Sequence, residues 1–255
     1  MTGTDSTTRF SKRVDDYVRY RPGYPAELVP ALLEHSGFDS TARVADIGSG
    51  TGIFTTRLLQ QELEVWAVEP NAPMRAAAEA ACGGNPLFHS IDASAEQTGL
   101  DSESIDLITA AQAFHWFDNA ASRTEFRRIL KPDGRLALIW NRRDTRQPFQ
   151  QVYDALLNEL APEYGKVNHM SLEQEQIASW FAAGEMRLLE FDNHQQLDFA
   201  NLLGRLRSAS YCPAEDSPHF IPLVNELLAQ FDHYADQGQV DFAYNTQLFI
   251  GPIRR

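Results

Sequence analysis

Short apolar runs that alternate with helix-like stretches between residues 43 and 140 constrain the fold more than any other feature. The runs are Arg43–Ile47, Glu64–Val68, Leu87–Ile91, Ile105–Ala110 and Arg135–Trp140. Short runs that are apolar almost throughout are typical of strands buried on both faces of a sheet. Because the links to the helical stretches are short, the sequence predicts an α/β fold, with parallel strands and helices on both faces.

The stretches before and between these strands have helical patterns. They are Pro25–Ser36, Phe54–Gln61, Ala72–Cys82 and Ala120–Leu130. Pro30 lies inside the first of them, and since proline has no N–H group it should kink or divide that helix. Lys131–Gly134 contains both Pro and Gly, which predicts a turn before the fifth strand.

After Arg146 the alternation is interrupted by a longer helical region. Its helical patterns are Gln151–Leu160, Leu172–Phe181, Phe199–Ser208 and Pro222–Tyr234. Leu188–Leu197 and Val240–Ile250 are predicted strands, the second because apolar and polar residues alternate along it. We therefore expect one sheet whose last two strands are separated by helical insertions, and these insertions are candidates for a lid.

A glycine-rich segment follows the first predicted strand, with the sequence Asp46-Ile-Gly48-Ser49-Gly50-Thr-Gly52. Glycines at a strand-to-helix turn allow a tight turn and a close approach of the backbone to a ligand. The spacing departs from the dinucleotide fingerprint, since position 53 is Ile, and the Gly-Lys-Ser/Thr of a P-loop does not follow. The loop therefore suits a nucleoside ligand that has no pyrophosphate.

Polar groups also stand at the carboxyl ends of the next three predicted strands. Glu69 ends the second strand, where a carboxylate can accept hydrogen bonds from two ribose hydroxyls, and Pro70 beside it offers an apolar face to a base. Asp92 ends the third strand and could accept from an exocyclic amine, while the backbone of Ala93 could serve the adjacent ring nitrogen. The fourth strand runs into Ala111–Gln112. Because open α/β sheets bind ligands at this edge, we expect these groups to line one site.

Each of the acidic residues also has a structural interpretation. Glu69 could be an acid favoured by the dipole at a helix N-terminus, and Asp92 could cap the turn at Ser94. Asp46 could buttress the glycine loop through backbone amides, which is compatible with a role in binding. The order in which the motifs occur favours ligand binding, because several levels of the sequence agree.

These motifs, in this order, resemble those of the class I S-adenosylmethionine-dependent methyltransferases. The resemblance rests on Asp46–Gly52, Glu69, Asp92-Ala93, Asp106–Trp116 and Leu130–Gly134, and it is strong over residues 10–145. The segments Tyr17–Pro25, Gln112–Phe117 and Leu206–Pro213 are similar to the subgroup of trans-aconitate methyltransferases and related small-molecule enzymes. The resemblance implies a Rossmann-like three-layer sandwich with a seven-stranded, mostly parallel sheet, an antiparallel last strand and helical insertions that form a lid.

The resemblance also implies S-adenosylmethionine as the methyl donor and S-adenosylhomocysteine as the product. The glycine loop would lie against the methionine part of the donor, Glu69 would hold the ribose, and Asp92-Ala93 would contact the adenine edge. The backbone of Ala111–Gln112 would face the donor's amino group, and Arg21 and Tyr17 would cover its carboxylate end. Residues 1–24 would then cover the donor site, residues 25–145 would form the donor-binding core, and residues 146–255 would form the lid and the last two strands of the same sheet.

The acceptor is expected near the residues that follow the fourth and fifth strands. His115 could accept a proton from a substrate hydroxyl near neutral pH, or it could be a structural histidine beside Trp116. Trp116 is a candidate for the wall of the acceptor pocket. Arg142 and Arg143 could hold an acidic substrate by paired hydrogen bonds, or they could be solvated loop arginines.

The function that the sequence predicts is methyl transfer to a small molecule, with oxygen as the preferred acceptor atom. The alternative is an S-adenosylmethionine-binding protein without transferase activity, such as a sensor or an assembly partner. A nicotinamide oxidoreductase is disfavoured by Ile53. The acceptor's identity and the oligomeric state stay open at this level.

Composition excludes several other classes of protein. The net charge is −13, from 35 acidic and 22 basic residues, which argues against nucleic acid and anionic membrane surfaces as partners. The 2 cysteines form neither a disulfide framework nor a metal knuckle, and the histidines lack metal-ligand spacing, so we expect no metal. The first ten residues contain no apolar signal core, and we expect an unexported, cytoplasmic protein.

Overall fold

The structure, a computed structural model, describes residues 14–166 and 174–254. Its centre is a seven-stranded sheet in the order β3-β2-β1-β4-β5-β7-β6. The strands are β1 Arg43–Ile47, β2 Glu64–Val68, β3 Phe88–Ile91, β4 Ile105–Ala111, β5 Leu130–Arg143, β6 Arg187–Leu197 and β7 Val240–Gly251. The strands from β3 to β5 pair in parallel, whereas β7 is antiparallel to both β5 and β6. The predicted seven-stranded, mostly parallel sheet with an antiparallel last strand is confirmed.

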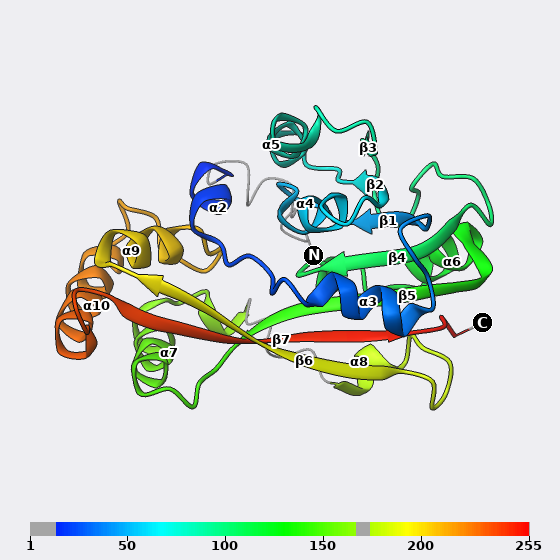
Figure 1. The fold of residues 1–255 in the computed structure, drawn as a ribbon. Coiled ribbons are helices and arrows are strands. Elements are labelled where there is room, and N and C mark those ends of the chain that lie inside the picture. Colours follow the sequence, from blue (N-terminus) through cyan, green and yellow to red (C-terminus); the bar gives the residue numbers. More distant parts are fainter. Residues whose placement is uncertain (1–13, 167–173, 255) are drawn as a thin grey trace.

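Two of the described helices precede β1, and the others occupy the intervals between the strands (Figure 1). They are α2 Val14–Tyr20, α3 Leu28–Ser36, α4 Ile53–Leu59, α5 Ala72–Cys82, α6 Ala120–Ile129, α7 Pro148–Leu160, α8 Gln174–Ala178, α9 Phe199–Arg207 and α10 Phe220–Tyr234, with 3-10 turns η1 Phe114–Trp116 and η2 Tyr164–Lys166. Most bounds lie within a few residues of those predicted. The first residues of the predicted helix Leu172–Phe181, and residues 1–13 of the predicted N-terminal segment, lie outside the described residues.

Side chains on alternate positions of the central strands enter two different cores. On one face, Val44 and Leu107 pack with Leu28 of α3 and with Phe54 of α4. On the other face, neighbouring positions such as Ile108 pack with α6 and α8. This alternation is what a period of two produces in a strand covered on both sides. The result is the three-layer arrangement that the sequence predicts.

A third core lies at one end of the molecule, among α7, α9 and α10. Figure 1 shows β6 and β7 continuing past the parallel strands toward these helices. Val240 and Phe242, at the start of β7, are buried in this core, while Leu248 and Ile250 of the same strand are buried in the sheet core. One strand thus joins the helical region to the sheet, and the carboxyl ends of the parallel strands face that region.

The expected effect of Pro30 on the first long helix is not observed. Helix α3 begins at Leu28, so Pro30 lies in its first turn rather than in its interior. The N–H groups of the first turn have no partner within a helix. Pro30 therefore removes no helical hydrogen bond there, and the helix continues through this residue to Ser36.

The expected turn at Lys131–Gly134 is a bulge within β5. Ile105 pairs with Leu130, but Leu107 already pairs with Arg135, so the intervening residues of β5 stand out from the ladder. Asp106 holds this bulge: its carboxylate accepts from Lys131 Nζ at 2.8 Å and from the backbone N–H of Arg43 at 2.9 Å. The strand consequently starts five residues earlier than predicted, directly after α6.

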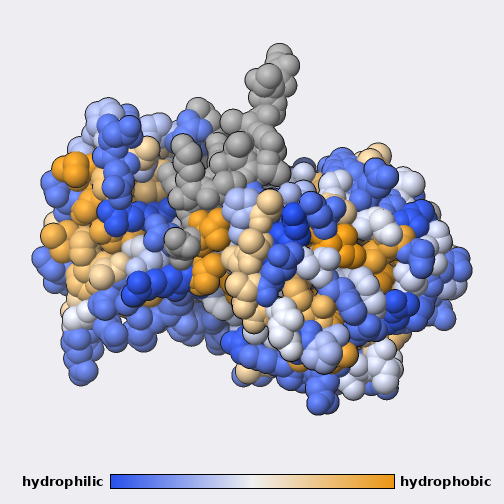
Figure 2. All heavy atoms as spheres, turned by 90° about the horizontal axis from the view of Figure 1, so that it is seen from above, coloured by the Kyte–Doolittle hydropathy of each residue, from blue (hydrophilic) through white to orange (hydrophobic). Residues whose placement is uncertain are grey.

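The surface seen from above in Figure 2 is mostly hydrophilic, with hydrophobic residues in separate patches. Among the described residues, the large apolar side chains classed as exposed are Val18, Leu188, Ile221 and Leu228. Scattered apolar residues of this kind are normal on a folded protein. No helix within residues 14–166 and 174–254 has both the length and the apolar character needed to span a bilayer.

Candidate functional site

Two cavities meet at the carboxyl ends of the parallel strands. The larger has a volume of about 330 Å³ and the smaller about 100 Å³. Residues that line both are Tyr17, Arg21, Gly48, Gly50, Ala111 and Gln112. The larger volume falls in the range typical of small-molecule sites. The edge of the sheet where both cavities open is the one at which α/β proteins bind ligands.

The glycine loop adopts a backbone conformation that other residues rarely adopt. Gly48, Gly50 and Gly52 have φ angles of 67°, 57° and 82°. A Cβ atom at Gly48 would lie 2.6 Å from the Cβ of Ala113, and one at Gly52 would lie 3.1 Å from the Cβ of Ala78. At Gly50 the nearest atoms would be 4.0 Å away. Gly48 and Gly52 thus permit close packing, whereas Gly50 leaves space beside a bare backbone.

Glu69 lies at the wall of the larger cavity, and the backbone fixes its carboxylate. Its two oxygens accept hydrogen bonds from Gly50 N–H at 2.9 Å and from Asn71 N–H at 2.8 Å. The residue is only 7% exposed, and burial raises the pKa of its carboxyl group against the opposing effect of these two amides and of Arg75. Pro70, the next residue, lines the same cavity. Each carboxylate oxygen retains a free lone pair, so the group can still accept from a ligand hydroxyl.

Asp46 lies under the glycine loop, and side-chain hydroxyls hold it. Thr55 Oγ1 donates to one carboxylate oxygen at 2.7 Å and Thr109 Oγ1 donates to the other at 2.9 Å. Burial raises the pKa of Asp46 to about 6, although these two hydrogen bonds act in the opposite direction. The buttressing interpretation fits this geometry, with threonine hydroxyls rather than backbone amides as the partners.

Asp92 and Ala93 do not line either cavity. The Asp92 side chain is 70% exposed and forms an ion pair with Arg75 at 2.9 Å. Arg75 also donates to the backbone oxygen of Glu69 at 2.8 Å. The lining at this end of the larger cavity comes instead from the residues that follow, Ser94–Glu96, which the sequence did not single out.

Gln112 combines a strained backbone with a place at both cavities. Its φ angle is 58°, in the left-handed region that costs a side-chain-bearing residue free energy. Two hydrogen bonds keep it there, from its N–H to the Ile139 oxygen at 2.9 Å and from Nε2 to the Asn141 oxygen at 3.1 Å. Ala111 lines both cavities with it, so the end of β4 lies where the sequence places it.

Tyr17 and Arg21 of the N-terminal segment line both cavities. The Arg21 guanidinium lies 4.7 Å from the centre of the Tyr17 ring and donates from Nη2 to the Ser208 oxygen at 3.0 Å. Further along, the side chains of Asn141 and Asn193 each donate to the Gly23 oxygen at 3.0 Å. The segment is therefore fixed both to the sheet and to the residues after α9.

His115 and Trp116 line the larger cavity together with Glu69. Their rings are 4.6 Å apart, and the His115 ring lies 5.6 Å from that of Trp140, which lines the smaller cavity. Trp116 is thus placed beside the groups expected to bind the donor, rather than with Arg142 and Arg143. His115 therefore belongs to the wall of the larger cavity and packs against Trp140, which lines the smaller one.

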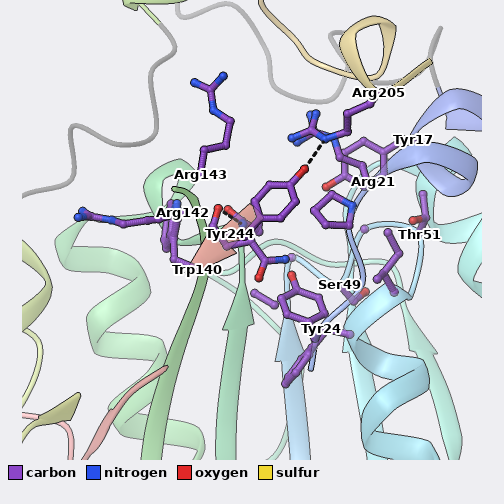
Figure 3. Close-up of a pocket in the computed structure, with 18 of the residues that line it drawn as sticks. Tyr17, Arg21, Tyr24, Ser49, Thr51, Trp140, Arg142, Arg143, Arg205 and Tyr244 are labelled. Carbon is purple, nitrogen blue, oxygen red and sulfur yellow. Dashed lines mark hydrogen bonds between the residues drawn. The ribbon is translucent and has the colours of Figure 1, made fainter. Parts of the chain in front are cut away.

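Arg143 is not a solvated loop arginine. Its side chain is 9% exposed and forms an ion pair with Asp154 at 3.0 Å, and the same nitrogen contacts the hydroxyl of Tyr164. Figure 3 shows Arg142 directed away from the group formed by Arg21, Arg205 and Tyr244. Both arginines line the smaller cavity, but Arg143 is the one that the fold buries there.

Several residues of the smaller cavity were not predicted from the sequence. They come from the helical region and from β7: Tyr164, Arg205, Tyr211 and Tyr244. Arg205 donates from Nε to the Tyr244 hydroxyl at 3.0 Å (Figure 3). One feature of the sequence could have indicated Arg205: it lies on the same face of α9 as Leu202 and Leu206. A charged residue on an apolar, buried face is stable only when it is paired with another polar group. Within the described ranges, no cluster of three or more His, Cys, Asp or Glu side chains could hold a metal ion.

Comparisons with known sequences identify the region that holds the glycine loop. Residues 45–138 match a family described as a methyltransferase domain. The chain is 32% identical over 245 residues to an uncharacterized methyltransferase of Mycobacterium tuberculosis, covering 95% of this chain and 94% of the relative. It is 27% identical over 240 residues to one from Schizosaccharomyces pombe, covering 91% and 92%. Similarity therefore extends through the helical region as well as the sheet.

Solved structures share the same arrangement of elements. A protein from Anaeromyxobacter dehalogenans assigned as a type II methyltransferase has a TM-score of 0.68 at 23% identity, covering 91% of this chain and 98% of that one. Phosphoethanolamine N-methyltransferase 2 of Haemonchus contortus, in complex with S-adenosyl-L-methionine, has a TM-score of 0.58 at 15% identity, covering 98% of this chain and 59% of that one. At these identities the likeness concerns the fold alone.

Proposed function

The chain belongs to the class I S-adenosylmethionine-dependent methyltransferases, and from this membership we propose that it methylates a small molecule, preferably at an oxygen atom. S-adenosylmethionine is the methyl donor, and S-adenosylhomocysteine is the product. The proposal concerns the acceptor, the atom that is methylated, and the roles of individual residues. Two adjoining cavities, one for each reactant, are the observation that supports it most directly.

We assign the larger cavity to the donor. Gly50 offers a backbone without a side chain, and Glu69 offers a buried carboxylate that the backbone already orients. The cavity is large enough for a nucleoside, and Pro70 and Trp116 supply apolar surface within it. Arg21 lies where the two cavities meet and would hold the donor's carboxylate. These residues fit a nucleoside with a charged amino-acid tail.

Methyl transfer requires the protein mainly to position the donor and the acceptor. The donor's sulfonium makes the methyl carbon electrophilic, so a bond forms from the acceptor oxygen to that carbon while the carbon–sulfur bond breaks and its electron pair goes to sulfur. The chain's residues would align the reactants and exclude water. A carboxylate acceptor loses no proton, whereas a hydroxyl acceptor would pass its proton to His115, which lines the larger cavity and contacts Trp140 of the smaller one.

A donor-binding protein without transferase activity would need the larger cavity alone. The buried tyrosines and arginines of the smaller cavity have no role in such a protein, and they cost free energy to bury. Their position beside the glycine loop favours a second reactant. This arrangement supports the transferase over the sensor or assembly partner.

Ligand binding and turnover test the proposal separately. Thermal unfolding with S-adenosylmethionine, S-adenosylhomocysteine or NAD should show stabilisation by the first two alone. Labelled donor is then incubated with small carboxylic acids and phenols, and products are scored by mass. Stabilisation by NAD alone would contradict the donor assignment. Binding of both sulfur ligands without any methylated product from either acceptor class would favour the binding protein.

A further inference from the structure

The smaller cavity is strongly basic although the chain as a whole is acidic. Arg21, Arg142, Arg143 and Arg205 line it, in a protein whose net charge is −13. Among the described residues, Asp46 is the acidic one that lines the same cavity. Both oxygens of Asp46 already accept from threonine hydroxyls, beneath the glycine loop. Positive charge is therefore concentrated where the acceptor would bind.

Three of these guanidinium groups carry buried nitrogen atoms that have no hydrogen-bond partner in the described part of the chain. They are Nε of Arg21, Nη1 of Arg143 and Nη1 of Arg205. Arg205 as a whole is only 5% exposed. A buried donor without a partner costs free energy, and native proteins rarely retain one without a reason. All three residues line the smaller cavity, so a ligand bound there is the candidate source of the acceptor atoms.

The partners of the three arginines do not balance their charge. Arg143 is paired with Asp154, but the Nε of Arg205 donates to Tyr244, which is a neutral phenol. The donor, as proposed above, brings one carboxylate, and Arg21 is the arginine placed at its cavity. Among the residues that the structure describes, no carboxylate then forms an ion pair with Arg205. A buried cation without a counter-charge is unfavourable. An anionic group of the acceptor would supply the missing negative charge.

The ionisation of Tyr211 responds to the same positive field. Burial by itself raises the pKa of this phenol, but the charges of Arg143, Arg205 and Arg21 outweigh burial and leave the pKa below its usual value. Tyr211 lines the smaller cavity and packs edge-on against Tyr164, with ring centres 4.9 Å apart. An oxyanion in this cavity would be stabilised by the same charges.

We propose that Arg143 and Arg205 form an oxyanion-binding site that holds a carboxylate or phosphate group of the methyl acceptor. This inference rests on the proposed function, in which the smaller cavity receives the acceptor. Each guanidinium presents a planar fork of N–H groups that matches the oxygens of either anion. Arg143 comes from the end of β5 and Arg205 from α9, so binding the anion would join the sheet to the helical region.

Calorimetric titration tests the site with defined probes. Succinate and glycerol 3-phosphate represent the two anions, and succinamide is the neutral control, each titrated with and without saturating S-adenosylhomocysteine. One of the two anions should bind and succinamide should not. Arg205→Gln should weaken anion binding at least about tenfold, the effect of losing a charged hydrogen bond, and should leave the affinity for S-adenosylhomocysteine within about threefold.

Two further variants control for folding and for general electrostatics. Arg205→Lys retains a cation and should recover part of the affinity for the anion. Arg146→Gln removes an arginine whose side chain is 83% exposed and which does not line the cavity, and it should change nothing. Unfolding midpoints of all variants show whether each is folded under the titration conditions.

Each other outcome has a definite meaning. Equal binding of succinate and succinamide, or unchanged anion binding in Arg205→Gln, overturns the oxyanion site. Loss of S-adenosylhomocysteine binding alone in Arg205→Gln assigns Arg205 to the donor and also overturns it. If the wild-type protein binds the anion in an Arg205-dependent way but not S-adenosylhomocysteine, the anion site stands and the proposed donor site fails.

Discussion

Among single residues, Gly48 is required for close packing, whereas Gly50 leaves space beside the backbone for a ligand. Alanine at Gly48 should therefore mainly lower stability, and alanine at Gly50 should mainly weaken ligand binding. A Cβ at Gly48 would meet Ala113 at 2.6 Å, whereas one at Gly50 would meet nothing nearer than 4.0 Å. Both have positive φ angles, which cost an alanine about 1–2 kcal/mol. Gly50→Ala should lose about that much stability yet bind S-adenosylhomocysteine at least about tenfold more weakly, because a methyl group would enter the site.

Gly48→Ala should be the less stable variant of the two, because the clash adds to the backbone cost. Gly99→Ala is the matched control, since Gly99 also has a positive φ angle, of 75°, and a Cβ there meets nothing within 4 Å. Urea unfolding measures stability and calorimetry measures binding. Unchanged affinity in Gly50→Ala would show that the ligand does not approach this part of the loop.

Asp46 gives a pH dependence whose sign is opposite to that of most paired carboxylates. Its pKa is about 6 in the folded chain, against an ordinary value of 3.8. Between these two values the folded chain keeps a proton that the unfolded chain has lost. The contribution of Asp46 to the free energy of unfolding therefore falls as pH rises through this window and is constant above it.

Asp46→Asn should remove this fall. Urea unfolding of both proteins from pH 4 to pH 7 gives the free energy of unfolding at each pH. The free energy of unfolding of the variant should rise relative to that of the wild type as pH increases. Asp133→Asn, at an exposed position of the β5 bulge, should show no such trend. A difference between Asp46→Asn and wild type that is constant with pH would mean that Asp46 is ionised normally in the folded protein.

Among elements, the contact between α2 and α9 depends on a glycine in the helix. A Cβ at Gly204 would lie 2.4 to 2.5 Å from ring atoms of Tyr20. Gly204→Ala improves helix propensity by up to about 1 kcal/mol, but the clash should outweigh this gain and destabilise the protein. Tyr20→Ala removes the ring with which the Cβ at position 204 would clash. The double variant with both substitutions should therefore be about 1 kcal/mol more stable than the sum of the two single effects predicts.

Gly165→Ala provides the control for this cycle, because nothing lies within 4 Å of a Cβ there. Its effect should add to that of Tyr20→Ala without any coupling. Additive effects for Gly204→Ala as well would show that α9 adjusts freely against α2. In that event the position of Arg205, the next residue of α9, would not depend on the N-terminal segment.

The elements also show what the sequence could predict. The strands and the glycine loop follow local rules, since an apolar run bounded by turns and a glycine at positive φ are both readable from a few neighbouring residues. The bulge after Leu130 is not, because it depends on Asp106, which contacts Lys131 from a different strand. The position of Asp92 likewise depends on its ion pair with Arg75, a choice of partner that only the packed structure decides.

The smaller cavity is the part of the site that the sequence predicted least. Arg143 was predicted because it follows a strand of the core. Arg205 and Tyr211 belong to the helical region, where the resemblance over Leu206–Pro213 assigned no residue to a binding site. They reach the cavity because β7 extends the sheet beneath that region, so Tyr244 can accept from Arg205. Long-range pairing of this kind is not encoded in any short window of sequence.

At the scale of the whole molecule, the helical region and the parallel strands should unfold together. β7 pairs with β5 from Leu136 to Arg143 and carries residues of both the sheet core and the helical core. The helical core therefore has no strand of its own on which to remain folded. The domain division expected from the sequence would then describe two functional regions within one cooperative unit.

The aromatic residues allow this expectation to be measured. All 4 tryptophans belong to or pack against the core on the face of the sheet that α6 and α8 cover: Trp66, Trp116, Trp140 and Trp180. Tryptophan fluorescence thus reports the sheet, while far-ultraviolet circular dichroism also reports the helices of the helical region. The two signals should give coincident unfolding curves in heat and in urea. Separate transitions would show that the helical region is a domain in its own right.

Binding of S-adenosylhomocysteine should move this single transition as a whole, although most of its proposed contacts lie in the parallel half of the sheet. At a hundred times the dissociation constant, the ligand adds about 2.7 kcal/mol to the free energy of unfolding, which corresponds to a rise of roughly 5–10 °C for a domain of this size. Glu69→Gln, which alters the carboxylate that Gly50 and Asn71 orient, should show a smaller rise at the same concentration. A rise seen by fluorescence but not by circular dichroism would mean that donor binding stabilises the sheet alone, and that the acceptor cavity between the two regions can open while the donor stays bound.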